Sequence, residues 1–143
     1  MKYRFYGADS GIKEDGAITS PEELYDLLET IWCKKTCAPR MQKDWSIENK
    51  TLGQCSITSF LAQDIFGGEV YGVELPDGNF HCFNVVDGKA FDLTSEQFKE
   101  KLDYSKAIRQ ERSVHFAKQE KYERYLFLKE KLNEITEKKT AHR

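Results

Sequence analysis

The dipeptide Asp87-Gly88 restricts the fold of this chain more than any other feature of the sequence. It joins two strand-like stretches, residues 80–86 and 89–93, and an Asp-Gly pair favours the two-residue turn whose twist suits a β-hairpin. A two-residue loop also fixes which residues face each other across the hairpin. The predicted pairs are Val86 with Lys89, Val85 with Ala90, Phe83 with Asp92, and His81 with Thr94.

This register places the polar side chains of the hairpin, because successive side chains of a strand point to opposite faces of a sheet. His81 and Asp92 fall on the same face as diagonal neighbours, within reach of each other. A carboxylate beside an imidazole orients the ring and holds one tautomer. Cys82 belongs to the opposite face, so we expect its thiol to point away from any site that His81 helps to form.

A helix is predicted to begin at Cys55, directly after a turn at Gly53. Apolar residues line one face of it between residues 57 and 65, and two glycines at 67–68 end it. The N-terminus of a helix and a neighbouring imidazolium both lower the pKa of a cysteine, and the thiolate is the nucleophilic form. Cys55 meets the first condition from sequence alone, and His81 could supply the second.

The rest of the chain is predicted to add further helices, one more strand and a long loop. Residues 20–23 (Ser-Pro-Glu-Glu) form a capping box with proline at the first helical position, and the apolar stripe behind them predicts a helix to about Cys37. Residues 38–52 form a long polar connection, often a sign of a functional loop, that leads straight to Cys55. The other predicted elements are a strand that residues 3–6 could form, a strand over 69–75, a short helix from Thr94 with Gln97 at capping-box spacing, and a charged helix over 114–138.

Length and composition predict a single globular domain over residues 1–143. The net charge is −2, and a phosphate-binding surface normally shows a basic excess, so nucleic acid is not an expected partner. The sequence has neither an apolar run that could cross a membrane nor the apolar segment of a signal peptide, so we expect no membrane association and a cytoplasmic location. In that compartment the four cysteines are expected to be free thiols, ligands or catalytic groups rather than disulfides.

Three short motifs along the chain resemble those of transglutaminases. Gly53-Gln54-Cys55 matches the Gly-Gln-Cys at their nucleophile, and Asp92-Leu93-Thr94 matches their Asp-x-Thr. Between these, His81-Cys82-Phe83-Asn84 resembles their His-x-Trp-Asn, with phenylalanine in place of tryptophan. The stretch from Trp45 to Phe98 is also similar to the small bacterial YunG-like proteins, whose pattern is a tryptophan, Gly-Gln-Cys, Gly-Gly, His-x-x-Asn, Asp-Gly and Asp-Leu-Thr-x-x-Gln-Phe.

The resemblance implies an α+β fold with a papain-like or transglutaminase-like core, in which the nucleophile helix packs on an antiparallel sheet and additional helices flank it. It also implies a cysteine-dependent acyl-transfer enzyme, an amide or ester hydrolase or a transferase, that works through a thioester. Cys55 would attack the acyl carbon, His81 would take up and return the proton, and Asp92 would orient His81. The substrate would be a protein, a peptide or a small acyl compound, and no cofactor is expected.

The same resemblance implies residues that assist these three. The backbone N–H of Cys55 would meet the oxyanion, helped by the Gln54 amide or by an upstream indole, for which Trp45 is the candidate. The residues expected to support the site structurally are Gly53, Asn84 and Thr94.

Two other interpretations remain open. A non-catalytic binding or scaffold domain could keep the same fold, which would agree with the lack of any substrate-specific motif. The second is a Cys/His zinc site, for which Cys33 and Cys37 could provide one pair of ligands at helical spacing. A zinc site normally needs four ligands in paired spacings, and the sequence has no second pair of the usual kind, so we favour the absence of a metal. We expect Cys33, Cys37 and Cys82 to be packing or incidental thiols, and His115 and His142 to be solvated or structural.

Overall fold

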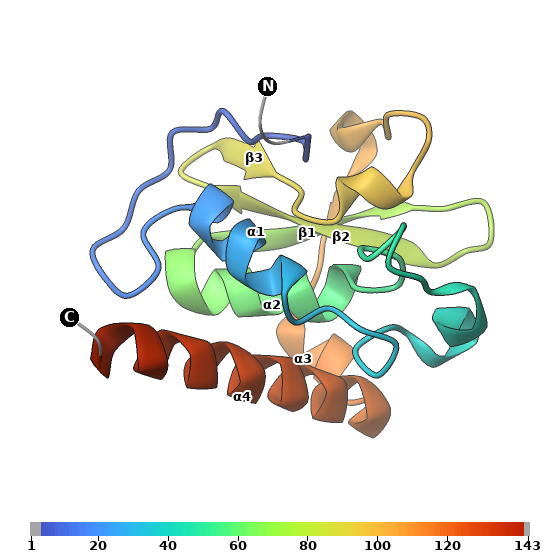
Figure 1. Ribbon diagram of the computed structural model, residues 1–143. Coiled ribbons are helices and arrows are strands. Elements are labelled where there is room, and N and C mark those ends of the chain that lie inside the picture. The colour runs from blue at the N-terminus through green and yellow to red at the C-terminus, as the bar shows by residue number, and fades with distance from the viewer. Residues whose placement is uncertain (1–3, 142–143) are drawn as a thin grey trace.

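Residues 4–141, the part of the chain that the structure describes, contain a four-stranded antiparallel sheet in the order β3-β2-β1-β4 (Figure 1). The structure is a computed structural model. The strands are β1 (Glu69–Glu74), β2 (Phe80–Val86), β3 (Lys89–Phe91) and β4 (Ile108–Arg109). The α-helices are α1 (Pro21–Glu29), α2 (Cys55–Phe66), α3 (Arg112–Phe116) and α4 (Gln119–Ala141). The connections include the 3-10 helices η1 (Pro39–Asp44), η2 (Ser95–Gln97) and η3 (Tyr104–Lys106).

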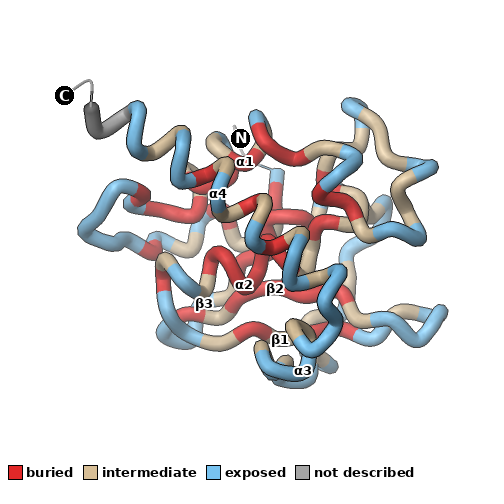
Figure 2. Tube along the Cα trace, turned by 90° about the horizontal axis from the view of Figure 1, so that it is seen from below, coloured by how far each residue is buried: buried red, intermediate tan, exposed pale blue. Residues whose placement is uncertain are grey.

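The helices gather on one face of this sheet. α2 packs directly against β2, and α4 lies across α2 on the side away from the sheet (Figures 1 and 2). The segment that contains η2 and η3 lies on the opposite side of the sheet (Figure 1). The predicted α+β class, with the helix of Cys55 packed on an antiparallel sheet, is therefore confirmed.

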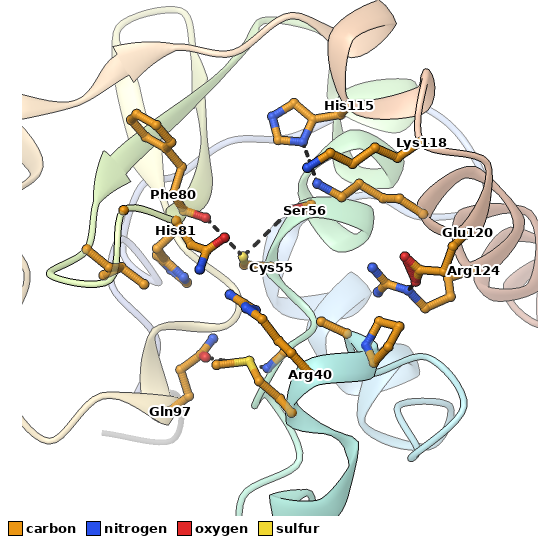
Figure 3. A pocket seen from close by; sticks show the side chains of 18 of the residues that line it. Arg40, Cys55, Ser56, Phe80, His81, Gln97, His115, Lys118, Glu120 and Arg124 are labelled. Atoms are coloured by element: carbon orange, nitrogen blue, oxygen red, sulfur yellow. Dashed lines mark hydrogen bonds and ion pairs between the residues drawn. The ribbon is translucent and has the colours of Figure 1, made fainter.

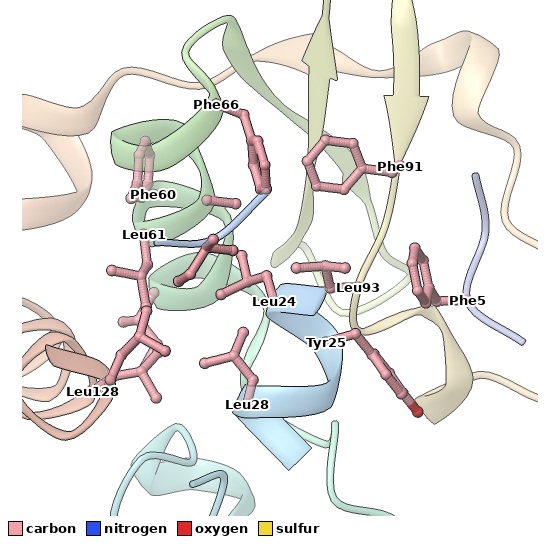
Figure 4. Packing of buried hydrophobic residues seen from close by; sticks show 14 of the residues in the cluster. Phe5, Leu24, Tyr25, Leu28, Phe60, Leu61, Phe66, Phe91, Leu93 and Leu128 are labelled. Carbon is pink, nitrogen blue, oxygen red and sulfur yellow. The ribbon is translucent and has the colours of Figure 1, made fainter. Parts of the chain in front are cut away.

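The hydrophobic core fills the space between α2 and its neighbours (Figure 4). Leu24 and Leu28 reach it from α1, Phe60 from α2, Leu128 from α4 and Phe91 from β3, and all five are fully buried. Burying one such side chain stabilises a fold by roughly 1.5–3 kcal/mol. This packing holds α2 from three sides and so fixes the position of its first residue relative to the sheet.

The β2–β3 hairpin has the register that the sequence predicts, as far as its ladder extends. Asn84 pairs with Phe91, Val85 with Ala90, and Val86 with Lys89. Asp87 and Gly88 both have positive φ angles, 51° and 77°, as a two-residue hairpin turn of this type requires. The ladder stops at Phe91, so the pairs predicted beyond it do not form. Asp92 instead pairs with Tyr6, whose carbonyl accepts the Asp92 N–H at 2.8 Å. This single bridge replaces the strand predicted for residues 3–6, of which residue 3 lies outside the described residues.

The first helix is shorter than predicted, because α1 ends at Glu29 and does not continue to Cys37. Beyond its end the Trp32 side chain is buried in the core, and its indole N–H donates to the Thr58 hydroxyl of α2 at 3.0 Å. Tertiary packing therefore turns the chain where local propensity favours more helix. As a consequence, Cys33 and Cys37 do not share a helix face, and the spacing argument that made them half of a zinc site is wrong.

Two further predicted helices differ from the structure. The predicted helix over 114–138 is two helices, α3 and α4. The short helix after Thr94 is the 3-10 helix η2, and the Thr94 hydroxyl contacts Asp92 Oδ1 instead of closing a capping box. Within the described residues, no helix combines the length and the apolar character that crossing a membrane requires.

Candidate active site

The turn before α2 brings Cys55 to the wall of a cavity. Gly53 has φ +72°, a conformation that favours glycine, and a side chain there would meet Cys37 Sγ at 2.5 Å. The Gly53 carbonyl accepts the Ala38 N–H at 2.9 Å. Gly53 therefore lets the chain pass close against residues 37–38 just before it enters the helix of Cys55.

His81 and Asp92 form a buried pair. His81 Nε2 lies 2.7 Å from Asp92 Oδ2, and each side chain is only 1% exposed. Because Nε2 is bound to the carboxylate, Nδ1 remains as the ring nitrogen for Cys55. The Phe98 ring stands edge-on to the imidazole, with 4.7 Å between the centroids, and restricts its rotation.

Asp92 is held on both of its oxygens. The Tyr104 hydroxyl donates to Oδ2 at 2.7 Å, and the backbone N–H of Thr94 donates to Oδ1 at 3.2 Å. Tyr104 comes from η3, and no sequence motif indicated a role for it. The carboxylate thus has donors from three residues and a fixed orientation toward His81.

Cys55 lies beside a second thiol. Cys82 Sγ lies 3.8 Å from the hydroxyl oxygen of Ser56, the residue that follows Cys55, and the Cys82 thiol is close enough to Cys55 to change its pKa. The prediction that Cys82 points away from the site is therefore wrong. Cys82 does lie on the face of β2 opposite His81, but α2 packs on that face and brings its first residue, Cys55, to the same place.

The two thiols and the imidazole have strongly different proton affinities. The hydrogen bond from Cys82 lowers the pKa of Cys55 most, burial opposes this, and the charge and hydrogen bond of His81 add to it, so that the pKa lies well below its usual range. The hydrogen bond to Cys55 and burial raise the pKa of Cys82. Burial disfavours a charged His81, but the charges of Asp92 and Cys55 outweigh it and raise the pKa of His81 to about 10. These shifts favour an ion pair between a Cys55 thiolate and a His81 imidazolium.

The start of α2 has backbone donors that its own helix does not use. Its N-cap residue, Gln54, makes no side-chain cap, and the first backbone bond of the helix runs from the Thr58 N–H to the Gln54 carbonyl at 3.2 Å. The N–H groups of residues 55–57 therefore have no acceptor within the helix. Donors of this kind, beside a nucleophile, can stabilise an oxyanion.

Other predicted site residues face elsewhere. Gln54 is fully buried, and its amide N–H donates to the Cys33 carbonyl at 3.1 Å. The Trp45 indole N–H donates to the Lys50 carbonyl at 3.0 Å. Neither side chain lines the cavity beside Cys55, so the structure does not bring them to the nucleophile. Asn84 donates to the carbonyl of Ser59 and so ties β2 to α2.

Cys55 and His81 line a cavity of about 430 Å³ (Figure 3). Small-molecule sites have volumes of about 300–1,000 Å³. Residues 38–41, from the long connection before Cys55, form part of the wall. The basic side chains in the wall are Arg40, Lys118, Lys121 and Arg124.

His115 lies in the same wall and is half-buried rather than solvated. Its Nε2 lies 2.8 Å from Gln110 Oε1, and its Nδ1 lies 2.9 Å from Lys121 Nζ. Burial and the charge of Lys121 lower the pKa of His115 to about 4, so the ring is neutral at pH 7 and Nδ1 accepts a hydrogen bond from Lys121. His142 lies outside the described residues.

The basic wall of the cavity was not predicted from the sequence. Lys118, Lys121 and Arg124 recur every three residues, and this spacing could have indicated a shared face. Which face of the helix meets Cys55, however, depends on how α4 crosses α2. In the described part of the chain, no group of three or more His, Cys, Asp or Glu side chains could hold a metal ion.

Comparison with known proteins places the chain in a family. A family model described as YunG protein matches residues 20–137, a range that includes Cys55, His81 and Asp92. The chain belongs to the YunG family. A similar protein is the "Uncharacterized protein YunG" of Bacillus subtilis (strain 168), 30% identical over 83 residues that make up 58% of this chain and 67% of the relative. No solved structure matches the chain. The predicted resemblance to YunG-like proteins is confirmed, and the relation to papain-like and transglutaminase-like enzymes stays a prediction.

Proposed function

We propose that this protein is a cysteine-dependent acyl-transfer enzyme, an amide or ester hydrolase or a transferase. The observation that carries the proposal is the buried His81–Asp92 pair, 2.7 Å apart, beside a low-pKa thiol that opens on a cavity. A histidine that served packing alone would need neither the thiolate nor the cavity. Perturbed titratable groups that converge on a cavity are the usual mark of a catalytic site.

The reaction would begin when the Cys55 thiolate attacks the acyl carbon, forming a C–S bond and moving the carbonyl electron pair onto oxygen. The free N–H groups at the start of α2 would donate to this oxyanion. As the carbonyl re-forms, the bond to the leaving group breaks, and the His81 imidazolium supplies its proton. The neutral His81 would then take a proton from water or from an acceptor amine, which attacks the thioester and releases the Cys55 thiolate.

The proposal includes a papain-like or transglutaminase-like core. Chain order supports it, because the nucleophile begins a helix, the base follows on a strand beneath that helix, and the orienting carboxylate follows the next strand. The bond between His81 Nε2 and Asp92 supports it as well, because it leaves Nδ1 for the thiol. Asp92 would hold the ring in this orientation while the proton moves.

Acetylation by p-nitrophenyl acetate tests the proposal. An activated Cys55 should take up the acetyl group as a thioester and release p-nitrophenolate, and peptide mass mapping should locate the group on Cys55. Cys33 is the matched control, because it is also a free, half-buried thiol. Release should be lost in Cys55→Ala and retained in Cys33→Ala. Equal acetylation of Cys55 and Cys33 would instead support the alternative predicted from the sequence, a non-catalytic binding or scaffold domain.

A further inference from the structure

We infer that the acyl substrate of this site carries an anionic group, a carboxylate or a phosphate, that binds basic side chains beside Cys55. The inference rests on the proposed function, because it names the class of substrate that Cys55 would attack. It concerns three residues that the proposed chemistry does not use. These residues, the basic cluster, are Arg40, Lys118 and Lys121, and all three line the same cavity as Cys55 (Figure 3).

The cavity has more positive charge than its own carboxylate can neutralise. Among the described residues that line it, one is acidic, Glu120, and it pairs with Arg124, which also donates to the Thr36 carbonyl at 3.0 Å. Among the residues that the structure describes, no carboxylate forms an ion pair with a member of the basic cluster. The chain as a whole has a net charge of −2, so the cavity differs in sign from the protein that surrounds it.

Lys121 is the member of the cluster that most needs an anion. Its side chain is half-buried, and its one hydrogen-bond partner among the described residues is the neutral His115 ring, 2.9 Å from Nζ. An ammonium group has three donors, so two remain for a ligand. Burial lowers the pKa of Lys121, and the charge of Cys55 in the same cavity offsets this only in part. A bound anion would offset the remaining cost of taking the ammonium group out of water.

Arg40 approaches the nucleophile from the other side of the cavity. Figure 3 shows its side chain directed toward Cys55 from η1, while Lys118 approaches from the opposite wall. The planar guanidinium fork suits carboxylate and phosphate oxygens, with which it forms paired hydrogen bonds. A substrate whose acyl carbon reaches Cys55 therefore has Arg40 on one side of it and Lys118 on the other, within the same cavity.

The charge preference of Cys55 for two alkylating reagents tests this inference. Iodoacetate and iodoacetamide are nearly equal in size, and iodoacetate alone carries a negative charge. The ratio of their second-order rate constants removes any effect on thiolate formation, because both reagents need the same thiolate. We expect the iodoacetate-to-iodoacetamide ratio at Cys55 to exceed that at Cys33 at least about fivefold, since a single contact between unit charges in water is worth about that factor.

Substitutions of opposite sign provide the controls. Arg40→Gln and Lys121→Gln should each lower the ratio at Cys55 about fivefold, whereas Glu120→Gln should raise it because it frees Arg124. Lys89→Gln removes an exposed charge at the start of β3 and should leave the ratio unchanged. A ratio at Cys55 equal to that at Cys33, or one that all of these substitutions leave unchanged, would overturn the inference.

The same experiment separates this inference from the proposed function and identifies the anion. Iodoacetamide alone reports whether Cys55 is an activated thiol, so failure of the proposed function would show in that rate, and failure of the inference only in the ratio. Succinate, inorganic phosphate and the neutral succinamide are then compared, at constant ionic strength, as protectants against iodoacetamide. Stronger protection by succinate assigns a carboxylate, and stronger protection by phosphate assigns a phosphate. Protection by succinamide equal to that by succinate would count against an anion subsite.

Discussion

Replacing Asp92 by asparagine should lower the pKa of His81 from about 10 to about 7. His81 Nε2 and Asp92 Oδ2 are 2.7 Å apart and buried, and the centres of the two delocalised charges are about 4 Å apart. At an effective dielectric constant of about 20, unit charges at that distance interact by about 4 kcal/mol. This energy corresponds to a factor of about 1,000 in the protonation equilibrium of the imidazole.

Nitrogen NMR of the imidazole rings measures this change directly. The chain has three histidines, and His115, with a pKa of about 4, titrates far from His81. Asp77→Asn is the control, because Asp77 lies in an exposed turn and its loss should leave the titration of His81 where it is. The account of the site would be refuted by a His81 that titrates near 6.5 in the wild type, or that still titrates near 10 in Asp92→Asn.

The same titration should appear in the pH dependence of stability. A histidine whose pKa is raised by folding stabilises the native state fully below its unfolded pKa of about 6.5, and this contribution is lost as the pH rises toward about 10. In the wild type, the low pKa of Cys55 has the opposite effect. It makes the native state more stable as the pH rises to about 8.5, where a cysteine of the unfolded chain ionises. In Cys55→Ser only the histidine contribution remains, and it is smaller, because the charge of Cys55 no longer helps to raise the pKa of His81. The unfolding free energy of Cys55→Ser should therefore fall continuously above pH about 6.5, by on the order of 3 kcal/mol, and urea titrations at several pH values check it.

Two further substitutions test how the site is positioned. Tyr104→Phe removes one donor to Asp92 and should lower the unfolding free energy by about 1.5–3 kcal/mol. The control is Tyr6→Phe, in the ring stacked on Tyr104, which should change the unfolding free energy by less than about 0.5 kcal/mol. Equal losses for the two variants in urea unfolding would contradict the contact between Tyr104 and Asp92. Gly53→Ala should cost more stability than Gly11→Ala. Both glycines have positive φ, but only a side chain at position 53 would collide with Cys37. Equal melting temperatures for the two variants would contradict this steric argument.

Local rules predicted the parts of the site that depend on neighbouring residues. The Asp87-Gly88 turn determines the hairpin register, and the turn at Gly53 determines where α2 begins. These two elements carry His81 and Cys55, and the structure brings both residues to one cavity. Asp92 meets His81 even though the ladder ends one residue earlier, because Tyr6 continues the pairing at that position.

The features that the sequence did not predict all depend on packing between distant segments. α1 ends early because Trp32 packs against α2, and Cys82 meets Cys55 because α2 covers that face of the sheet. Lys121 enters the cavity only because α4 crosses α2 at one particular place. Periodicity shows which residues of an element share a face, but it does not show what that face contacts.

The rate of Cys55 alkylation by iodoacetamide at pH 6, relative to Cys33, tests the central claim most directly. An ordinary cysteine is only about 0.3% thiolate at that pH, so an ionised Cys55 has up to about 300 times more nucleophile. A thiolate of low pKa is intrinsically less reactive, which cancels about half of that gain on a logarithmic scale. The account predicts that Cys55 reacts on the order of 10-fold faster than Cys33 at pH 6, and that His81→Ala reduces the difference. A Cys55 whose rate rises with pH in parallel with that of Cys33 would contradict it.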